Sequence, residues 1–405
     1  MNRVYKFRIY PTSAQKTALA KSFGCCRWYW NYSLNLCQET YLTSGKSLSR
    51  FAIQSLLPEL KKEHEWLSDA YSQCLQSVAL NLSRAYKNFF EKKAGLPSFK
   101  SKHGRQSISY PSNVKCDGDY IKLPGKIGKI YCIQHRTFTG KIKTVTVSLN
   151  PDGLYYVSIL VDNKKELPPS STEGKAIGID LGITPNFAIT SDGSKFDNQR
   201  LTSKYARNLK KKQQSKNRKK LGSNSRAKAK RLVASLHSKI RRVREDFLHK
   251  LSRKLVNENQ VIVVENLNVK GMVRNHNPRG VDCGWGMFCT MLKYKSEWSG
   301  KTYKEVDRFF AFSKTCNVCL NKVDSLNLDI RNWVCNKCHT SHDRDINSAI
   351  NIRNEGLRIL SLGTSDTANG GNVRQPGKTS VLLDAIPDEV GSPRLGRWVV
   401  HSLLD

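Results

Sequence analysis

Gln260-Val-Ile-Val-Val-Glu265 is a short apolar run that ends in a carboxylate, and Ala176-Ile-Gly-Ile-Asp180 has the same form. Short runs rich in valine and isoleucine are typical of strands that are buried on both faces of a sheet. We therefore expect both runs to be central strands. Because an acid ends each strand, Asp180 and Glu265 should project from rigid elements into a shared cleft.

The elements around these two strands follow a recognisable order. They are strands at 187–190 and 195–196, a long helical stretch at about 203–257, the strand that ends in Glu265, a helix at 285–298, a strand at 302–306 and a helix at 345–354. Three strands, a helix, a strand, a helix, a strand and a last helix match an RNase H-like fold. The sequence therefore predicts an α/β domain of this type.

A third acid, Asp345, begins the last expected helix, and Asp343 lies two residues before it. Three carboxylates at one point repel one another unless cations lie between them. Oxygen ligands favour Mg²⁺ or Mn²⁺, and two such ions about 3.5–4 Å apart can activate a water and stabilise the leaving oxygen of a phosphodiester. A single acid at a strand end is more often a cap or a solvated turn residue, so the prediction of a metal-dependent nuclease depends on the order of the elements.

Two cysteine pairs have the spacing of a zinc ribbon. Cys316-Asn-Val-Cys319 and Cys335-Asn-Lys-Cys338 are separated by 15 residues. Two such CxxC pairs can hold four thiolates tetrahedrally around one zinc ion. Four protein ligands leave no open position, so we expect a structural rather than a catalytic Zn²⁺. His339 and His342 lie nearby but are not needed as ligands.

The charge of the chain indicates a polyanionic partner. The 405 residues carry a formal net charge of +35, and this excess is clustered. A merely basic protein without such a partner is the alternative. No apolar run approaches the roughly 20 residues that span a bilayer, and the first residues lack the apolar core of a signal peptide. We therefore expect no membrane association and a cytoplasmic location.

The strongest concentration of positive charge lies in the helical stretch between the two proposed catalytic strands. We expect it to flank the cleft and to bind phosphates, although a charge run is more often a solvated face. The residues predicted to do this are Lys210, Lys211, Lys212, Arg218, Lys219, Lys220, Arg241, Arg242 and Arg244.

The first part of the chain has a different pattern. Residues 1–10 alternate as a strand, the pattern from Gln15 to about Leu60 is helical, and 66–91 is the clearest helix. Residues 106–162 alternate with period two, as β-strands do, and we expect the N-terminal strand to join them. The segment 361–405 has no period and is rich in Gly, Ser, Pro and Asp, so it is expected to be disordered.

With these residues in place, the chain resembles the TnpB/OrfB family of insertion-sequence-encoded proteins, which are relatives of the type V CRISPR effector nucleases. The resemblance covers the chain to about residue 356, and the stretch from Arg274 to Cys283 is shorter than the usual family loop. Its motifs are Phe7 to Gln15, Gly24 with Arg27 to Asn31, Gly95 to Lys102, Gly178 to Gly182, Val264 to Gly271, Gly284 to Gly286, and Ser313 to Cys316 with His342 to Asn347. Within these motifs we expect Arg27, Lys100 and Lys102 to contact nucleic acid.

The resemblance implies a division of labour along the chain. It implies a β-rich wedge domain that binds guide RNA (1–10 and 105–167), a helical recognition domain (11–104), a RuvC-like nuclease domain (168–312 and 341–356), a zinc ribbon that binds target nucleic acid (313–340) and a disordered tail (357–405). By the same analogy Asp180, Glu265 and Asp345 carry the Mg²⁺ or Mn²⁺ ions. The family has its third acid in an Asp-x-Asn pattern, which favours Asp345 over Asp343.

The function that the resemblance implies is RNA-guided cleavage. The expected partners are a guide RNA from the transposon end and a double-stranded DNA target, and a monomer is favoured. In such a protein base pairing selects the target, and the protein grips backbone shape and charge. A transposase that performs strand transfer and a guided DNA-binding repressor are the alternatives.

Overall fold

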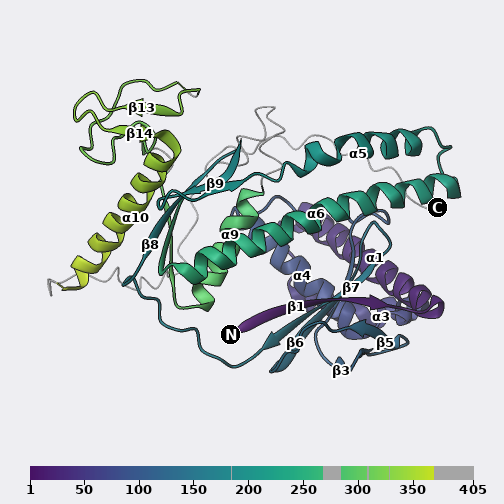
Figure 1. The fold of residues 1–405 in the computed structure, drawn as a ribbon. Coiled ribbons are helices and arrows are strands. Elements are labelled where there is room, and N and C mark those ends of the chain that lie inside the picture. The colour runs from purple at the N-terminus through teal and green to yellow at the C-terminus, as the bar shows by residue number, and fades with distance from the viewer. Residues whose placement is uncertain (184, 268–283, 308–309, 328, 369–405) are drawn as a thin grey trace. The chain divides into compact units, whose positions relative to one another are not determined.

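The computed structural model describes residues 1–183, 185–267, 284–307, 310–327 and 329–368, and only the backbone of residues 363–368 (Figure 1). Residues 1–358 form one compact unit, and they contain three sheets. The predicted loop from Arg274 to Cys283 and the tail beyond residue 368 lie outside the described residues. Within the described part no helix is both long and apolar enough to cross a membrane.

The first sheet has seven antiparallel strands. They are β1 (Asn2–Tyr10), β2 (Gln106–Tyr110), β3 (Lys115–Asp117), β4 (Tyr120–Leu123), β5 (Gly128–Ile133), β6 (Lys141–Leu149) and β7 (Tyr155–Asp162). Their order in the sheet is β2-β6-β7-β1-β5-β4-β3. β1 lies between β7 and β5, so the first residues of the chain join the later β-rich segment, as expected. Near the end of β1, Phe7 and Ile9 are buried, whereas Arg8 and Tyr10 face solvent.

Helices cover the buried face of this sheet. They are α1 (Ser13–Ser44), α2 (Arg50–Ser55), α3 (Leu57–Glu63), the 3₁₀ helix η1 (Glu65–Asp69) and α4 (Ser72–Phe90). The capping box of Thr12 and Gln15 starts α1, and Gly45 ends it in the left-handed region. The sheet and the helices share one apolar core, in which Phe7 and Ile9 belong to the same cluster as Leu19 and Leu75.

The predicted helix at 66–91 begins later than expected, at Ser72. Residues 65–69 form the separate turn η1, and the backbone at Ala70 and Tyr71 is extended. The Asp69 carboxylate at the end of η1 binds Lys21 at 3.2 Å and Lys126 at 2.8 Å, so ion pairs with α1 and with the first sheet hold this turn. Local periodicity does not register such contacts between distant segments.

The second sheet contains the two apolar runs. Its strands are β8 (Ala176–Leu181), β9 (Asn186–Thr190), β10 (Lys195–Asp197), β11 (Val261–Glu265) and β12 (Thr302–Val306), in the order β10-β9-β8-β11-β12. β8, β11 and β12 are parallel, and β9 and β10 are antiparallel to their neighbours. Both runs are therefore central strands, as predicted. Ile179, Ile262 and Val264 pack into the same core as Phe288 of α9 (Trp285–Trp298).

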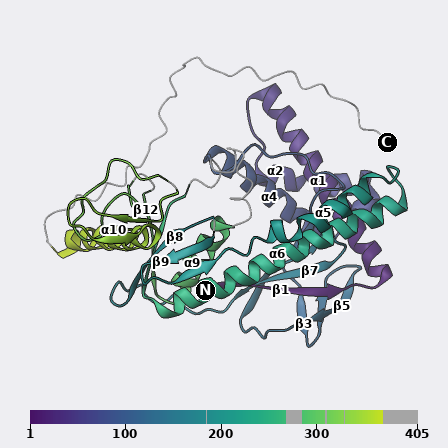
Figure 2. The ribbon, with the colours of Figure 1, turned by 45° about the horizontal axis from the view of Figure 1, so that its top comes forward.

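The basic stretch predicted as one long helix at 203–257 is a pair of helices. α5 (Leu201–Asn217) and α6 (Asn224–Glu258) pack side by side (Figures 1 and 2). Gly222 adopts a positive φ of 80°, and Ser223 caps α6 by accepting a hydrogen bond from the Arg226 backbone N–H at 3.2 Å. A single helix was the wrong prediction because lysine and arginine on both sides of the turn hide it from a charge or hydropathy pattern.

The last helix, α10 (Arg344–Ala368), packs directly on the second sheet. A Cβ atom on Gly178 of β8 would overlap the Ala349 carbonyl oxygen, and one on Gly356 would overlap the Val263 side chain. These two glycines let the helix and the sheet approach closely. The helix extends beyond the predicted end at Asn354, so residues 357–368, predicted as part of a disordered tail, are helical.

Candidate active site and metal centre

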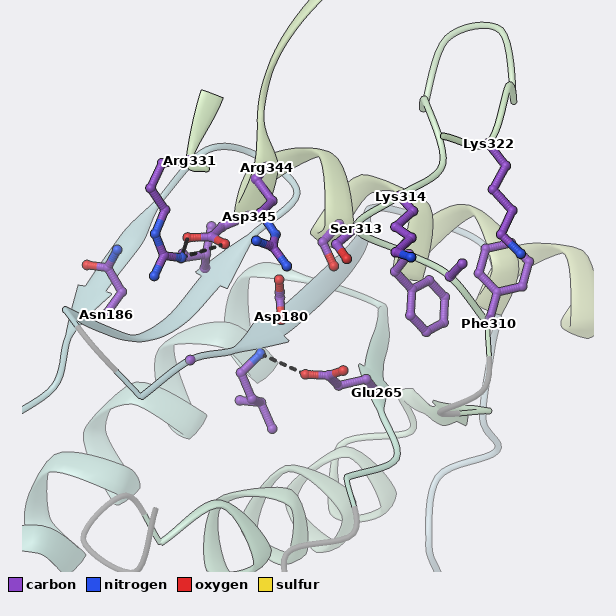
Figure 3. Close-up of a pocket in the computed structure, with 16 residues that line it drawn as sticks. Asp180, Asn186, Glu265, Phe310, Ser313, Lys314, Lys322, Arg331, Arg344 and Asp345 are labelled. Carbon is purple, nitrogen blue, oxygen red and sulfur yellow. Dashed lines mark hydrogen bonds and ion pairs between the residues drawn. The ribbon is translucent and has the colours of Figure 1, made fainter. Parts of the chain in front are cut away.

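The two strand-terminal acids lie side by side. β8 and β11 are parallel, and Ile179 is opposite Val264, so the residues that follow, Asp180 and Glu265, are neighbours at the same edge of the sheet (Figure 3). Glu265 Oε1 also accepts a hydrogen bond from the Leu181 backbone N–H at 3.3 Å. The sequence prediction that these carboxylates share a cleft is therefore matched by the geometry.

Asp180 and Glu265 are both harder to ionise than ordinary carboxyl groups. Burial raises the pKa of Glu265 to about 8, and the neighbouring Asp180 carboxylate adds to this rise. Burial also raises the pKa of Asp180 to about 6, with a further contribution from Asp345, while the Ser348 hydroxyl favours the charged form. Without a cation, the pair therefore retains a proton near neutral pH. Two buried carboxylates that repel each other form a donor set suited to a hard divalent cation.

Asp343 and Asp345 have different surroundings. Asp343 caps α10, because its Oδ1 accepts the backbone N–H of Asp345 at 3.0 Å and of Ile346 at 3.1 Å, and it forms an ion pair with Lys195 at 2.6 Å. Asp345 lies in the first turn of α10 and forms an ion pair with Arg331 at 3.3 Å. Asp345 lines the same cavity as Asp180 and Glu265, and its charge contributes to the raised pKa of Asp180.

All three acids line one cavity of about 740 Å³ (Figure 3). Four basic residues that were not among the predicted site residues also line it: Lys314, Lys322, Arg331 and Arg344. Three of them belong to the ribbon segment and one begins α10. Their proximity to CxxC pairs and to Asp345 was visible in the sequence, but no periodicity or run of charge marked them. The cavity thus combines acids that suit a cation with bases that suit a phosphate.

The basic residues predicted on α5, on α6 and in the turn between them do not contribute to the lining of this cavity. Lys210, Lys211, Arg218, Lys220, Arg241 and Arg242 are exposed, and Lys212, Lys219 and Arg244 are partly buried. The expectation that this segment flanks the cleft stays a prediction, and the cations that line the cavity itself are a different set. The two helices offer a separate basic surface.

Two of the three basic residues predicted near the N-terminus have contacts within the chain. Arg27 Nη1 donates to Gln106 Oε1 at 3.1 Å, which connects α1 with β2. Lys100 Nζ lies 3.5 Å from the centre of the Trp30 ring. Its pKa falls to about 8 because burial disfavours the charged form. Lys102 is exposed.

The four ribbon cysteines converge. The sulfur atoms of Cys316, Cys319, Cys335 and Cys338 all lie within 4.8 Å of one another. Four thiols at this separation fit one tetrahedral zinc ion. Cys335 and Cys338 lie in the loop that joins β13 (Asn332–Val334) to β14 (Ser341–Asp343), and Cys316 and Cys319 precede this hairpin. His342 was expected to have no ligand role, and its Nε2 lies 3.1 Å from Cys316 Sγ, a hydrogen-bonding distance.

Two buried asparagines connect this metal centre with α10. Asn347 and Asn351 are 1% and 4% exposed. The side-chain amide of Asn351 donates to the carbonyls of Phe312 and Thr315 at 2.8 and 2.6 Å, and that of Asn347 donates to the Thr315 carbonyl at 2.8 Å. The chain entering the first CxxC pair is therefore fastened to the helix that carries Asp345.

Comparison with known proteins gives relatives along nearly the whole chain. A protein of Streptomyces pristinaespiralis named "Putative RNA-guided DNA endonuclease" is 34% identical over 403 residues, which cover 98% of this chain and 99% of that protein. "Putative RNA-guided DNA endonuclease InsQ" of Escherichia coli (strain K12) is 31% identical over 384 residues, covering 89% and 94%. The chain belongs to the TnpB/OrfB family. Within this TnpB/OrfB chain, the OrfB family described as "Probable transposase" matches residues 157–276, and a "Cas12f1-like, TNB domain" matches 285–352.

Two further comparisons concern the fold of this TnpB/OrfB protein. A cryo-EM structure titled as a Cas12f1–sgRNA–target DNA complex aligns with a TM-score of 0.55 at 14% identity, over 87% of this chain and 98% of the Cas12f1 chain. A family described as "Helix-turn-helix domain" matches residues 1–46. In this structure that segment consists of strand β1 and the continuous helix α1, rather than of two helices joined by a turn.

Proposed function

We propose that this protein is an RNA-guided, Mg²⁺-dependent DNA endonuclease of a transposable element, and that residues 168–312 and 341–356 form its RuvC-type, RNase H-like nuclease domain. The observation that carries the proposal is the convergence of Asp180, Glu265 and Asp345 on one cavity that basic residues also line. The strand order β10-β9-β8-β11-β12, with two antiparallel strands beside three parallel ones, supports the RNase H-like assignment. The names of the relatives support guided cleavage of DNA.

The charged residues at and beside the cavity have distinct tasks in this proposal. Asp180, Glu265 and Asp345 would hold Mg²⁺ or Mn²⁺, which supplies charge neutralisation and a water of lowered pKa for attack on phosphorus. Asp343 holds the start of α10 as its cap, which keeps Asp345 in the first turn of the helix at the edge of the cavity. Lys314, Lys322, Arg331 and Arg344 bind the phosphates of the strand and keep it at the carboxylates.

The other parts of the chain serve the nucleic acids. We assign guide RNA binding to the wedge (1–10 and 105–167), the guide–target duplex to the helices at 11–104, and target contact to the zinc ribbon (313–340). The basic helices α5 and α6 suit a duplex backbone, because their lysines and arginines are mostly exposed.

The test uses the full chain purified with the RNA that accompanies it. That RNA is sequenced, and a plasmid carrying the matching target is offered with Mg²⁺. The wild type should cut the plasmid, and Asp180→Ala should bind RNA and target but not cut. The matched control is Asp246→Ala, which removes an exposed acid of α6 that pairs with Lys250. Cutting by Asp180→Ala, or strand transfer without RNA, would reject the proposal; the second result would identify a transposase.

A further inference from the structure

Three tyrosines form a row on the outer face of the first sheet. Tyr10 of β1 is paired with Tyr131 of β5, and Tyr131 is paired with Tyr120 of β4. Paired residues of neighbouring antiparallel strands point to the same side, so the three rings share one face. Their ring centres are 5.8 Å apart for Tyr10 and Tyr131 and 5.7 Å for Tyr120 and Tyr131.

The core of the sheet does not require these rings. The neighbours that point inward, Ile9, Cys132 and Ile121, are 2%, 0% and 0% exposed and belong to the apolar core. The tyrosines point the other way and are 38–47% exposed. Exposed aromatic residues grouped in one place mark a binding surface more often than isolated ones do. The three exposed rings therefore indicate a binding surface for a ligand with flat groups that can stack on them.

The same face carries positive charge. Arg8, Lys115, Lys122 and Lys129 are exposed, and strand pairing brings them to the side of the tyrosines. The Arg8 guanidinium lies 4.7 Å from the centre of the Tyr10 ring. Within β3, β4, β5 and the part of β1 that pairs with β5, all of which the structure describes, Asp117 is the one acid on this face, and it pairs with Lys129 at 3.0 Å. Two copies of so basic a face would repel each other, which disfavours self-association.

We propose that Tyr10, Tyr120 and Tyr131, with Arg8, Lys115, Lys122 and Lys129, form a platform on which unpaired nucleotides of RNA stack. We call this surface the tyrosine platform. Every base has a flat face that stacks on an aromatic ring, and the cations attract the phosphates between the bases. A double helix has its bases stacked inside, so it cannot use the rings. The proposal rests on the proposed function and deepens it by naming the surface for an unpaired segment of the guide.

RNA is the better occupant because of where the platform lies. The acids that would cut DNA belong to the second sheet, and the platform belongs to the first (Figure 2). A DNA strand must be delivered to the carboxylates and released after cutting. A guide must stay bound on a surface that does not carry those acids, and the outer face of the first sheet is such a surface.

The experiment measures binding of the full chain, freed of copurified RNA, to a 2-aminopurine-labelled oligoadenylate RNA and to a fully paired RNA duplex of equal length. Tyr120→Thr with Tyr131→Thr keeps residues that favour strands but removes the rings. We expect binding of the single strand to weaken by about tenfold for each lost stack, and duplex binding to be unchanged. Stacking on the rings quenches the fluorescence of 2-aminopurine. The wild type should therefore quench this fluorescence on binding, and the threonine variant should not.

The matched controls separate stacking from folding and from charge. Tyr120→Phe with Tyr131→Phe should bind like the wild type, because the rings remain. Tyr41→Ala, which removes an exposed tyrosine of α1, should also have no effect. Lys115→Gln with Lys122→Gln should lower the salt dependence of binding by about 0.7 for each lost phosphate contact, whereas the threonine variant should leave that slope unchanged.

The platform is rejected if the threonine variant binds the single strand like the wild type, or if it loses single strand and duplex equally. It is also rejected if the wild type binds an unpaired DNA strand as tightly as RNA and the threonine variant loses the same affinity for both. A wild type that dimerises through this face, with a monomeric variant, would reject it too. The proposed function can fail separately. If the protein stacks RNA on the tyrosine platform but does not cut DNA, the platform stands and the proposed nuclease function is rejected. Asp180→Ala should bind oligoadenylate like the wild type.

Discussion

The side-chain oxygen of Asn347 accepts a hydrogen bond of 3.0 Å from the backbone N–H of Asn317, which lies inside the first CxxC pair. Asn347 is two residues from Asp345 on α10. One buried amide thus contacts both the loop that holds the proposed zinc and the helix that carries the proposed third acid. The two metal sites should therefore depend on each other.

The first prediction concerns this amide. Asn347→Ala leaves the partly buried Asn317 N–H without its partner, which costs about 1–3 kcal/mol. We expect a lower melting temperature and weaker Mn²⁺ binding at the three acids, measured by Mn²⁺ electron paramagnetic resonance. Asn354→Ala, an exposed position on the same helix, is the control. Equal Mn²⁺ affinity in both variants would show that Asn347 does not position Asp345.

Zinc should be required for metal binding at the three acids, because Asn347 connects the ribbon loop with α10. We expect one zinc ion per chain by elemental analysis, and Cys335→Ser should lose it. Because the ribbon loop is fastened to α10, zinc loss should also weaken Mn²⁺ binding at the acids, although no cysteine belongs to that cavity. Cys116→Ser, at a partly buried cysteine of the first sheet, should keep both metals. A zinc-free protein with unchanged Mn²⁺ affinity would separate the two sites.

The raised pKa values predict how stability depends on pH. The pKa values of Asp180 and Glu265 are raised to about 6 and about 8, so each protonated carboxyl stabilises the metal-free fold at low pH. That stability is fully present below the ordinary carboxyl pKa of about 4 and is lost as the pH rises through 6 and then 8. Mg²⁺ binds the deprotonated pair, so it should raise the melting temperature more at about pH 8.5 than at about pH 5.5. Asp180→Asn with Glu265→Gln should abolish this difference.

Arg331 should compete with metal cations for the Asp345 carboxylate. Its Nη1 lies 3.3 Å from both carboxylate oxygens of Asp345, and both side chains are partly exposed. Removing an exposed ion pair changes affinity only modestly, so Arg331→Ala should tighten Mn²⁺ binding by about 2- to 5-fold without nucleic acid. The same variant should cut DNA more slowly, because the cavity loses a phosphate contact. Weaker Mn²⁺ binding would contradict this competition, and Arg358→Ala serves as the control for loss of an arginine.

The central strands and the carboxylate pair could be predicted from the sequence for a physical reason. A strand buried on both faces must be apolar throughout, so β8 and β11 are visible as runs, and the acids at their ends stand out. Parallel pairing then brings Asp180 and Glu265 together without further information. The pattern of α9 and β12 was equally local, and both elements were predicted with their observed bounds.

Features that depend on contacts between distant segments could not be predicted. Lys322 and Arg331 line the cavity of the acids only because the ribbon segment folds back to it. Asn347 and Asn351 are polar residues on the buried side of α10, so they weaken the apolar periodicity that identifies a helix face. The outward tyrosines alternate as any strand residue does, and their grouping requires the strand register. In each case the prediction would have required knowledge of the tertiary structure.

The last prediction concerns the close approach of α10 to the sheet. In Gly178→Ala the new methyl group meets the Ala349 carbonyl oxygen and the Arg353 backbone nitrogen, and neither backbone atom can rotate away. Overpacking of this kind costs about 1–3 kcal/mol. α10 should shift along with Asp345, so the melting temperature and the Mn²⁺ affinity should fall together. Gly286→Ala is the matched control, because a Cβ there meets nothing within 4 Å and alanine favours the helix α9. If the Gly178 variant melted like the control, the contact between α10 and β8 would not hold Asp345 at the carboxylate pair.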